Sequence, residues 1–211
     1  IVRGGRIVGR GYHERFGGPH AEPNALREAG RRARGATVYV TLEPCGHHGK
    51  TPPCTDALIA AGVVRVVAAM KDPNPLVGGK GFRRLRAAGI RTESGLLRRE
   101  AAAINAPFIT FHTLHRPYII LKWAQSIDGK IATRTGDSKW ITSRGSRAAA
   151  HALRARVDAI IVGIGTILAD DPELTARLAR PRRTAVRVVL DPRLRTPASA
   201  KVVQTARRIP T

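Results

Sequence analysis

The chain has 211 residues, of which 43% are apolar, and this is enough for a packed core in one large or two small domains and excludes a disordered tail. Its formal net charge of +22 raises the question of nucleic acid. The basic residues are evenly spread, 18 against 8 acidic residues in 1–115 and 19 against 7 in 116–211, and aromatic residues make up only 4%, so nucleic acid is not expected as the main partner.

The first half of the chain alternates predicted strands and helices. The expected strands are 6–12, 37–41 and 65–69, with a further one near 91–93. The expected helices are 21–33, 55–61, 80–88 and 97–105. Such alternation predicts an α/β domain in which helices cover a sheet.

The alternation breaks near residues 112–116, where a second unit is predicted to begin. Its expected elements are an apolar segment at 118–123, a turn at Asp128-Gly129, a helix around 145–156 and a buried strand at 159–162. A Gly163-Ile164-Gly165-Thr166 run follows that strand, but an isolated G-x-G is often only a tight turn.

A His-x-Glu followed by two cysteines is the most informative pattern in the chain. His20, Cys45 and Cys54 could supply three ligands of a tetrahedral zinc with an open fourth position, and Glu22 could move protons as a general acid and base. His20 and Cys54 also precede predicted helices, where the helix dipole favours a thiolate. In nucleobase deaminases a His-x-Glu followed by C-x-x-C has these roles. Here the cysteines are spaced C-x8-C, which narrows the kind of deaminase that the pattern indicates.

Each of these residues also has an ordinary structural explanation. A single His is usually structural, two Cys residues could be small buried apolar groups, and a disulfide would need an oxidising compartment. Together, in this order and with Glu22, they favour a zinc site. A zinc-stabilised module without activity would have no use for Glu22 and would close the fourth position with a protein ligand.

Longer motifs resemble the bifunctional deaminase-reductase of riboflavin biosynthesis. In the first half they are His20-Ala21-Glu22, the segment 43–54 (EPCGHHGKTPPC) and 72–75 (DPNP). In the second half they are 126–129 (SIDG), 138–143 (SKWITS) and 163–172 (GIGTILADDP). The resemblance implies a three-layer α/β/α domain of the cytidine deaminase type at 1–113, followed by an incomplete α/β domain of the dihydrofolate reductase type at 116–211.

The resemblance also implies a chemistry for each half. The first would use Zn²⁺ and Glu22 to deaminate a small-molecule substrate, a ribosylamino-pyrimidine 5′-phosphate, and the second would reduce the product with NADPH. The implied substrate contacts in the first half are His13, His47 and Lys50, although these could be ordinary loop residues. In the second half, the implied NADPH residues are Ala124, Trp140, Thr166 and Asp170, and the implied sugar phosphate residues are Ser138, Arg154, Leu174 and Arg177. In a chain so rich in Arg, a solvated surface position is a strong alternative for Arg154 and Arg177.

Compared with that family, we expect the chain to be a fragment. The first helix and an Asn-containing loop are expected upstream of Ile1, and the rest of the reductase, including a glycine-rich cofactor segment, beyond Thr211. We therefore expect no NADPH-dependent reduction by this chain, and exposed apolar faces on 159–162 and 186–190.

Two expectations concern assembly and location. No run of 18 apolar residues and no leader opens the chain, so we expect no membrane segment and a cytoplasmic protein, which we also expect to be a homo-oligomer. The alternative function is a zinc deaminase that acts on a base in tRNA or single-stranded DNA, against which the C-x8-C spacing and the reductase motifs count.

Overall fold

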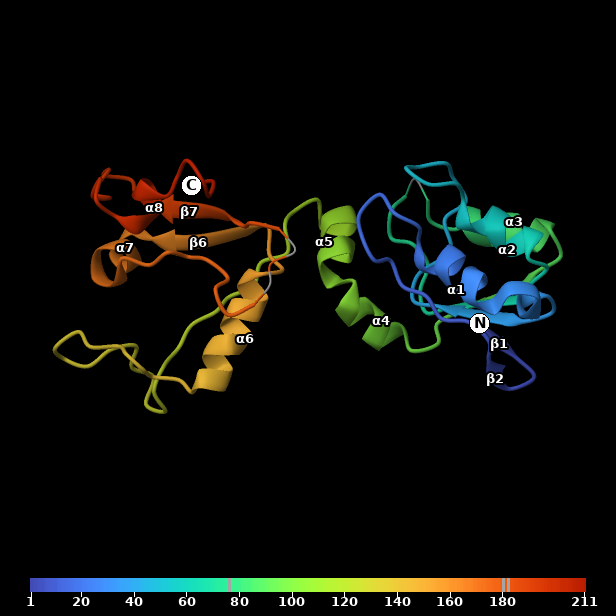
Figure 1. The fold of residues 1–211 in the computed structure, drawn as a ribbon, viewed down its shortest axis with the longest axis horizontal. Helices are drawn as coiled ribbons and strands as arrows, with labels where there is room; N and C mark the ends of the chain where they lie inside the picture. Colours follow the sequence, from blue (N-terminus) through green and yellow to red (C-terminus); the bar gives the residue numbers. More distant parts are fainter. Residues whose placement is uncertain (76, 180, 182) are drawn as a thin grey trace. The chain divides into compact units, whose positions relative to one another are not determined.

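A computed structural model describes residues 1–75, 77–179, 181 and 183–211, and the chain divides into two compact units, residues 1–119 and 120–211. Unit 1 contains the elements from β1 to α5, and unit 2 contains those from α6 to α8 (Figure 1). No helix among the described residues is both long and apolar enough to span a bilayer.

Unit 1 is built on a mixed five-stranded sheet in the order β2-β1-β3-β4-β5. Its strands are β1 (Val2–Arg3), β2 (Arg6–Ile7), β3 (Thr37–Val40), β4 (Arg65–Ala68) and β5 (Arg91–Ser94). The last three are parallel and in register, with Thr37 opposite Arg65 and Arg65 opposite Arg91. The carboxyl ends of these three strands therefore meet at one edge of the sheet, where the loops that follow them come together.

The helices of unit 1 include those that the alternating pattern predicted, and α5 in addition. They are α1 (Ala21–Ala29), which continues into the 3₁₀ turn η1 (Gly30–Ala33), α2 (Cys54–Ala60), α3 (Lys80–Ala87), α4 (Arg98–Ile104) and α5 (Ala106–Leu114). Ala25 and Ala29 of α1, Leu58 of α2 and Leu85 of α3 share one buried apolar cluster with Val38 and Val66 of the sheet. Ala101 of α4 and Ile109 of α5 belong to a separate cluster around Met70.

The predicted strand at 6–12 was wrong beyond Ile7. The segment that follows lies on helix α1, because a Cβ at Gly9 would come within 2.3 Å of the Ala25 carbonyl oxygen and one at Gly11 equally close to that of Ala21. The two glycines thus allow the backbone to lie against the helix, and the segment leads directly to His20.

Unit 2 holds α6 (Arg144–Arg154), β6 (Ala159–Gly163), α7 (Ile164–Asp170), β7 (Val186–Leu190) and α8 (Lys201–Gln204). Strands β6 and β7 pair in parallel, and Ile164, Ile167, Leu174 and Val202 are buried in the same cluster. The Asp128-Gly129 turn is present, with the Gly129 amide donating to the Ser126 carbonyl. Segment 118–123 forms no strand, and β6 is not a buried strand, because exposed and half-buried residues alternate along it.

Arg187 of β7 is only 1% exposed and organises the interior of unit 2. Its guanidinium donates to the carbonyl oxygens of Glu173, Val202 and Ile209 and to the hydroxyls of Thr205 and Thr211. A planar fork with five N–H donors can serve these separated acceptors at once, whereas a Lys ammonium cannot.

We therefore predict that Arg187→Lys lowers the free energy of unfolding of unit 2 by at least about 2 kcal/mol, because each buried acceptor left unpaired costs about 1–3 kcal/mol. Hydrogen exchange of peptides that cover β7, followed in increasing urea, measures this change. The exposed Arg193 gives the matched control, and Arg193→Lys should leave the exchange unchanged. Equal protection in both variants would contradict the role given to Arg187.

Candidate metal centre and substrate pocket

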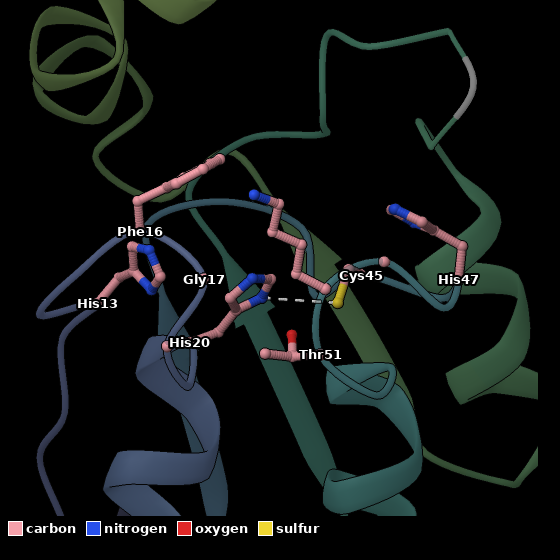
Figure 2. A pocket seen from close by; sticks show the side chains of 10 residues that line it. His13, Phe16, Gly17, His20, Cys45, His47 and Thr51 are labelled. Carbon is pink, nitrogen blue, oxygen red and sulfur yellow. Dashed lines mark hydrogen bonds between the residues drawn. The ribbon is translucent and has the colours of Figure 1, made fainter.

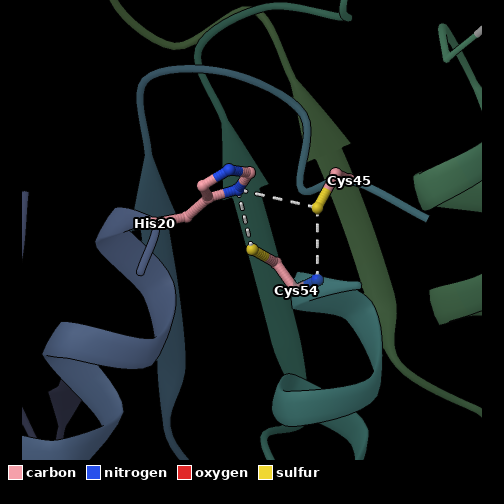
Figure 3. Close-up of side chains that lie close together, drawn as sticks. All are labelled: His20, Cys45 and Cys54. Atoms are coloured by element: carbon pink, nitrogen blue, oxygen red, sulfur yellow. Dashed lines mark hydrogen bonds between the residues drawn. The ribbon is translucent and has the colours of Figure 1, made fainter. Parts of the chain in front are cut away.

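His20, Cys45 and Cys54 lie close together in space, although they are far apart in the sequence (Figure 3). His20 is the residue before α1, with an extended backbone conformation. Cys45 lies in the turn that leaves β3, and Cys54 is the first residue of α2. The sulfur and nitrogen atoms that could bind a metal all lie within 4.8 Å of one another.

The separations between these atoms fit a zinc ion. The His20 Nδ1 atom lies 3.3 Å from the Cys54 Sγ atom and 3.7 Å from the Cys45 Sγ atom. A tetrahedral zinc with Zn–S of about 2.3 Å and Zn–N of about 2.0 Å holds its nitrogen and sulfur ligands about 3.5 Å apart. One nitrogen and two sulfurs, with no fourth member of the cluster among the described residues, match the donor set of an open, catalytic type of zinc site.

The two thiols differ in acidity. A hydrogen bond with Cys54 and the nearby His20 lower the pKa of Cys45 to about 5, against the effect of its partial burial. The hydrogen bond with Cys45, and then burial, raise the pKa of Cys54. The expectation that the start of a helix favours the Cys54 thiolate stays a prediction, because a bound metal would lower the pKa of both thiols. A negative charge on both sulfurs would need a cation beside them, and a divalent metal held by His20, Cys45 and Cys54 would supply it.

Glu22 lies in the first turn of α1, two residues after His20, and is 7% exposed. Burial raises the pKa of its carboxyl group, while hydrogen bonds with its own backbone and with Cys54 oppose this shift. The Glu22 carboxyl group is thus held beside a sulfur ligand and away from bulk water.

A pocket of about 230 Å³ opens next to the cluster (Figure 2). It brings together five of the residues singled out in the sequence, which are His13, His20, Cys45, His47 and Lys50. The His13 ring packs edge-on against His20, with centroids 5.3 Å apart, and its Nδ1 atom is 3.0 Å from the Pro19 carbonyl oxygen. This contact fixes the orientation of His13 at the pocket wall.

Five residues that line the pocket had no predicted role: Phe16, Gly17, Gly18, Gly49 and Thr51. The Lys50 ammonium lies 3.9 Å from the centroid of the Phe16 ring, an arrangement that favours the cation electrostatically. Phe16 stands alone among polar residues and glycines, so no periodic pattern could have indicated it. Its position between His13 and His20 was the available signal.

The candidate sugar phosphate residues of unit 2 are partly gathered. Burial lowers the pKa of the half-buried Arg154, and the positive charge of the nearby, exposed Arg177 lowers it further. The Arg177 amide donates to the Nδ1 atom of the buried His151. Leu174 is buried in the apolar cluster, and Ser138 is half-buried. Because the Leu174 side chain is buried, only the backbone of Leu174 could contact a ligand.

The candidate NADPH residues of unit 2 are less clearly assembled. Trp140 is exposed and packs under the Arg147 guanidinium at 4.4 Å, while Thr166 and Asp170 are exposed on α7 and Ala124 is half-buried in a loop. Among the described residues, no hydrogen bond, ion pair or ring contact joins Trp140 to Thr166 or Asp170.

Comparison with protein families assigns both units. Residues 1–70 match the cytidine and deoxycytidylate deaminase zinc-binding region, and residues 117–210 match the RibD C-terminal domain. The fold class predicted from the sequence is confirmed, with a cytidine-deaminase-like α/β domain followed by a dihydrofolate-reductase-like one.

Individual relatives are similar across almost the whole chain. The riboflavin biosynthesis protein RibD of Aquifex aeolicus is 56% identical over 97% of this chain and 58% of its own length, and that of Escherichia coli is 50% identical over 97% and 59%. The solved structure of Acinetobacter baumannii RibD superposes with a TM-score of 0.85 at 45% identity, covering 96% of this chain and 58% of that one.

A Thermotoga maritima structure described as a diaminohydroxyphosphoribosylaminopyrimidine deaminase/5-amino-6-(5-phosphoribosylamino)uracil reductase gives a TM-score of 0.82 at 48% identity, over 90% of this chain and 54% of that one. The chain thus spans a little over half the length of the relatives that it matches. With a deaminase zinc-binding region and a RibD C-terminal domain in one chain, and relatives of such identity along nearly all of it, the chain belongs to the RibD family.

Proposed function

We propose that unit 1 catalyses the hydrolytic deamination of 2,5-diamino-6-ribosylamino-4(3H)-pyrimidinone 5′-phosphate, a step of riboflavin biosynthesis. The observation that carries the proposal is the convergence of the His20 nitrogen and the Cys45 and Cys54 sulfurs beside Glu22, at the edge of a pocket. Membership of the RibD family supports a free nucleotide as the substrate class.

In this proposal His20, Cys45 and Cys54 hold the metal. Bound zinc would act as a Lewis acid that lowers the pKa of a water molecule, so that a nucleophile forms at neutral pH. The Glu22 carboxylate accepts the proton of the attacking water and then donates it to the departing amino group. A C–O bond forms at the amino-bearing ring carbon, the C–N bond breaks, and ammonia leaves.

His13, His47 and Lys50 are proposed to bind the substrate. All three line the pocket, and the Lys50 ammonium is suited to the 5′-phosphate as a compact positive charge. The Phe16 ring helps to hold that ammonium at the pocket wall, since the cation lies over its face.

We further propose that residues 1–113 form the deaminase part and 116–211 belong to the reductase part, which uses NADPH in the whole protein. Arg154 and Arg177 are adjacent positive charges and suit the sugar phosphate, together with Ser138 and the backbone of Leu174. Ala124, Trp140, Thr166 and Asp170 are proposed for NADPH. We also propose that the protein is cytoplasmic and forms a homo-oligomer.

Ammonia release from two substrates tests the substrate class. We predict that the zinc-loaded chain releases ammonia from the free pyrimidine nucleotide. It should leave the cytosine and adenine bases of a single-stranded oligonucleotide or a tRNA intact. Deamination of the oligonucleotide or tRNA, with none of the free nucleotide, would favour a nucleic-acid base deaminase and would overturn the proposal.

A further inference from the structure

The carboxylate of Glu43 is buried behind the turn that carries Cys45, and the proposed chemistry gives it no role. Glu43 is only 4% exposed. Its Oε2 atom accepts hydrogen bonds from the Gly79 amide at 2.8 Å and the Asp72 amide at 3.2 Å, and its Oε1 atom accepts one from the Phe82 amide at 3.1 Å. One side chain therefore ties the turn after β3 to the loop after β4 and to the start of α3.

The backbone contacts around Glu43 are unusually close. A Cβ at Gly81, the second residue of α3, would lie 1.9 Å from the Pro44 carbonyl oxygen. A Cβ at Gly46 would in turn lie 3.2 Å from the Gly81 backbone. The start of α3 thus rests directly on the residues either side of Cys45, and no residue larger than glycine fits at position 81.

The other side of Cys45 is held by the start of α2. The Cys54 amide donates to the Cys45 Sγ atom at 3.2 Å, and the Thr55 amide donates to the Cys45 carbonyl at 3.2 Å. Cys45 itself lies outside any helix or strand. Its position therefore depends on α2 on one side and, through Glu43, on the start of α3 on the other.

We propose that Glu43 is a positioning residue that fixes the Cys45 sulfur for the metal. This inference rests on the proposed function, because it takes His20, Cys45 and Cys54 as the ligands. A carboxylate is needed because its oxygens accept hydrogen bonds and donate none, so it can receive all three amides. In Gln the NH₂ group replaces one of these oxygens, and it would face an amide that is itself a donor.

Partners that orient a metal ligand typically contribute about 10- to 100-fold to metal affinity or activity. We therefore expect Glu43→Gln to weaken Co²⁺ binding by about 10- to 100-fold in titrations of the full chain. Co²⁺ is the probe because its thiolate charge-transfer band reports directly on the cysteines, and this band should weaken at saturation in the variant. Glu93→Gln is the matched control, since Glu93 is exposed and pairs only with Arg65 among the described residues.

A second control separates positioning from general loss of stability. Val66→Ala removes buried volume from β4, in the apolar cluster shared by the sheet and helices α1 to α3, which includes no residue of the Cys45 turn. Weaker Co²⁺ binding in Glu43→Gln than in Val66→Ala, at equal stability to urea, supports the inference. Glu43→Gln could fold only with metal. In that case Val66→Ala is placed in enough urea to be as unfolded without metal as Glu43→Gln is, and the Co²⁺ concentrations that fold the two variants are compared.

Three outcomes would overturn the inference. Affinity and spectrum equal to those of the parent chain would show that Glu43 does not position Cys45. Weakening equal to that of Val66→Ala would show that Glu43 acts only through stability. A parent chain that binds Co²⁺ without a thiolate band would overturn the proposed metal site itself, and this inference with it.

Discussion

Replacing Glu22 by Gln is expected to leave zinc bound and to slow ammonia release by about 10²- to 10⁴-fold, the range that general acid and base catalysis contributes. The amide has nearly the same shape as the carboxyl group, so the start of α1 and the position of His20 should be preserved. It cannot accept the proton of water or deliver one to the departing amine. The measurement is ammonia release at saturating nucleotide, with zinc content determined on the same sample.

Glu28→Gln provides the control on the same helix. Glu28 is exposed and accepts a hydrogen bond from the Arg10 amide, so this substitution removes a negative charge of α1 outside the pocket. Its rate should stay within a few-fold of the parent. Near-normal ammonia release from Glu22→Gln would rule out the role proposed for Glu22.

Replacing either cysteine by Ala is expected to abolish stable zinc binding. Cys45 and Cys54 are the only two cysteines of the sequence, so each variant keeps one sulfur and the His20 nitrogen. Two protein ligands are fewer than the three that catalytic zinc sites use, and zinc should be lost on dialysis. Elemental analysis after refolding with the metal gives the zinc content per chain.

Thr51→Ala is the control for the cysteine variants. Thr51 lines the same pocket but is not a member of the cluster of metal-binding atoms, so zinc content should stay at one per chain. Unchanged zinc in both Cys45→Ala and Cys54→Ala would refute the ligand set.

The order and spacing of a few residues in the sequence are enough to indicate the metal cluster, because the chemistry depends on a few residue types. His20 and Glu22 share the start of one helix, and Cys54 begins another, so local helix signals predict where their backbones turn. Strands β3 and β4 are equally visible as short runs rich in β-branched residues that follow Gly35 and Gly62. The parallel pairing of these strands then brings the loops together.

What the sequence did not indicate depends on contacts between distant segments. The strand predicted at 6–12 failed because Gly9 and Gly11 pack against helix α1, which no local pattern reveals. Helix α5 (Ala106–Leu114) was not predicted, since its apolar residues, such as Phe108 and Ile109, show no clear helical stripe. Glu43 belongs to the 43–54 motif but was given no role of its own, because its three amide donors come from residues 29 to 39 positions later.

The X-ray absorption spectrum of zinc in the full chain tests the account most directly, because it identifies the atoms bound to the metal. We predict two sulfur atoms at about 2.3 Å, one imidazole nitrogen at about 2.0–2.1 Å and one further light atom from solvent. The sulfur signal should fall to one atom or disappear in Cys45→Ala and Cys54→Ala. A zinc shell without sulfur in the parent chain, or one with four sulfurs shared between two chains, would contradict a deaminase centre built from His20, Cys45 and Cys54.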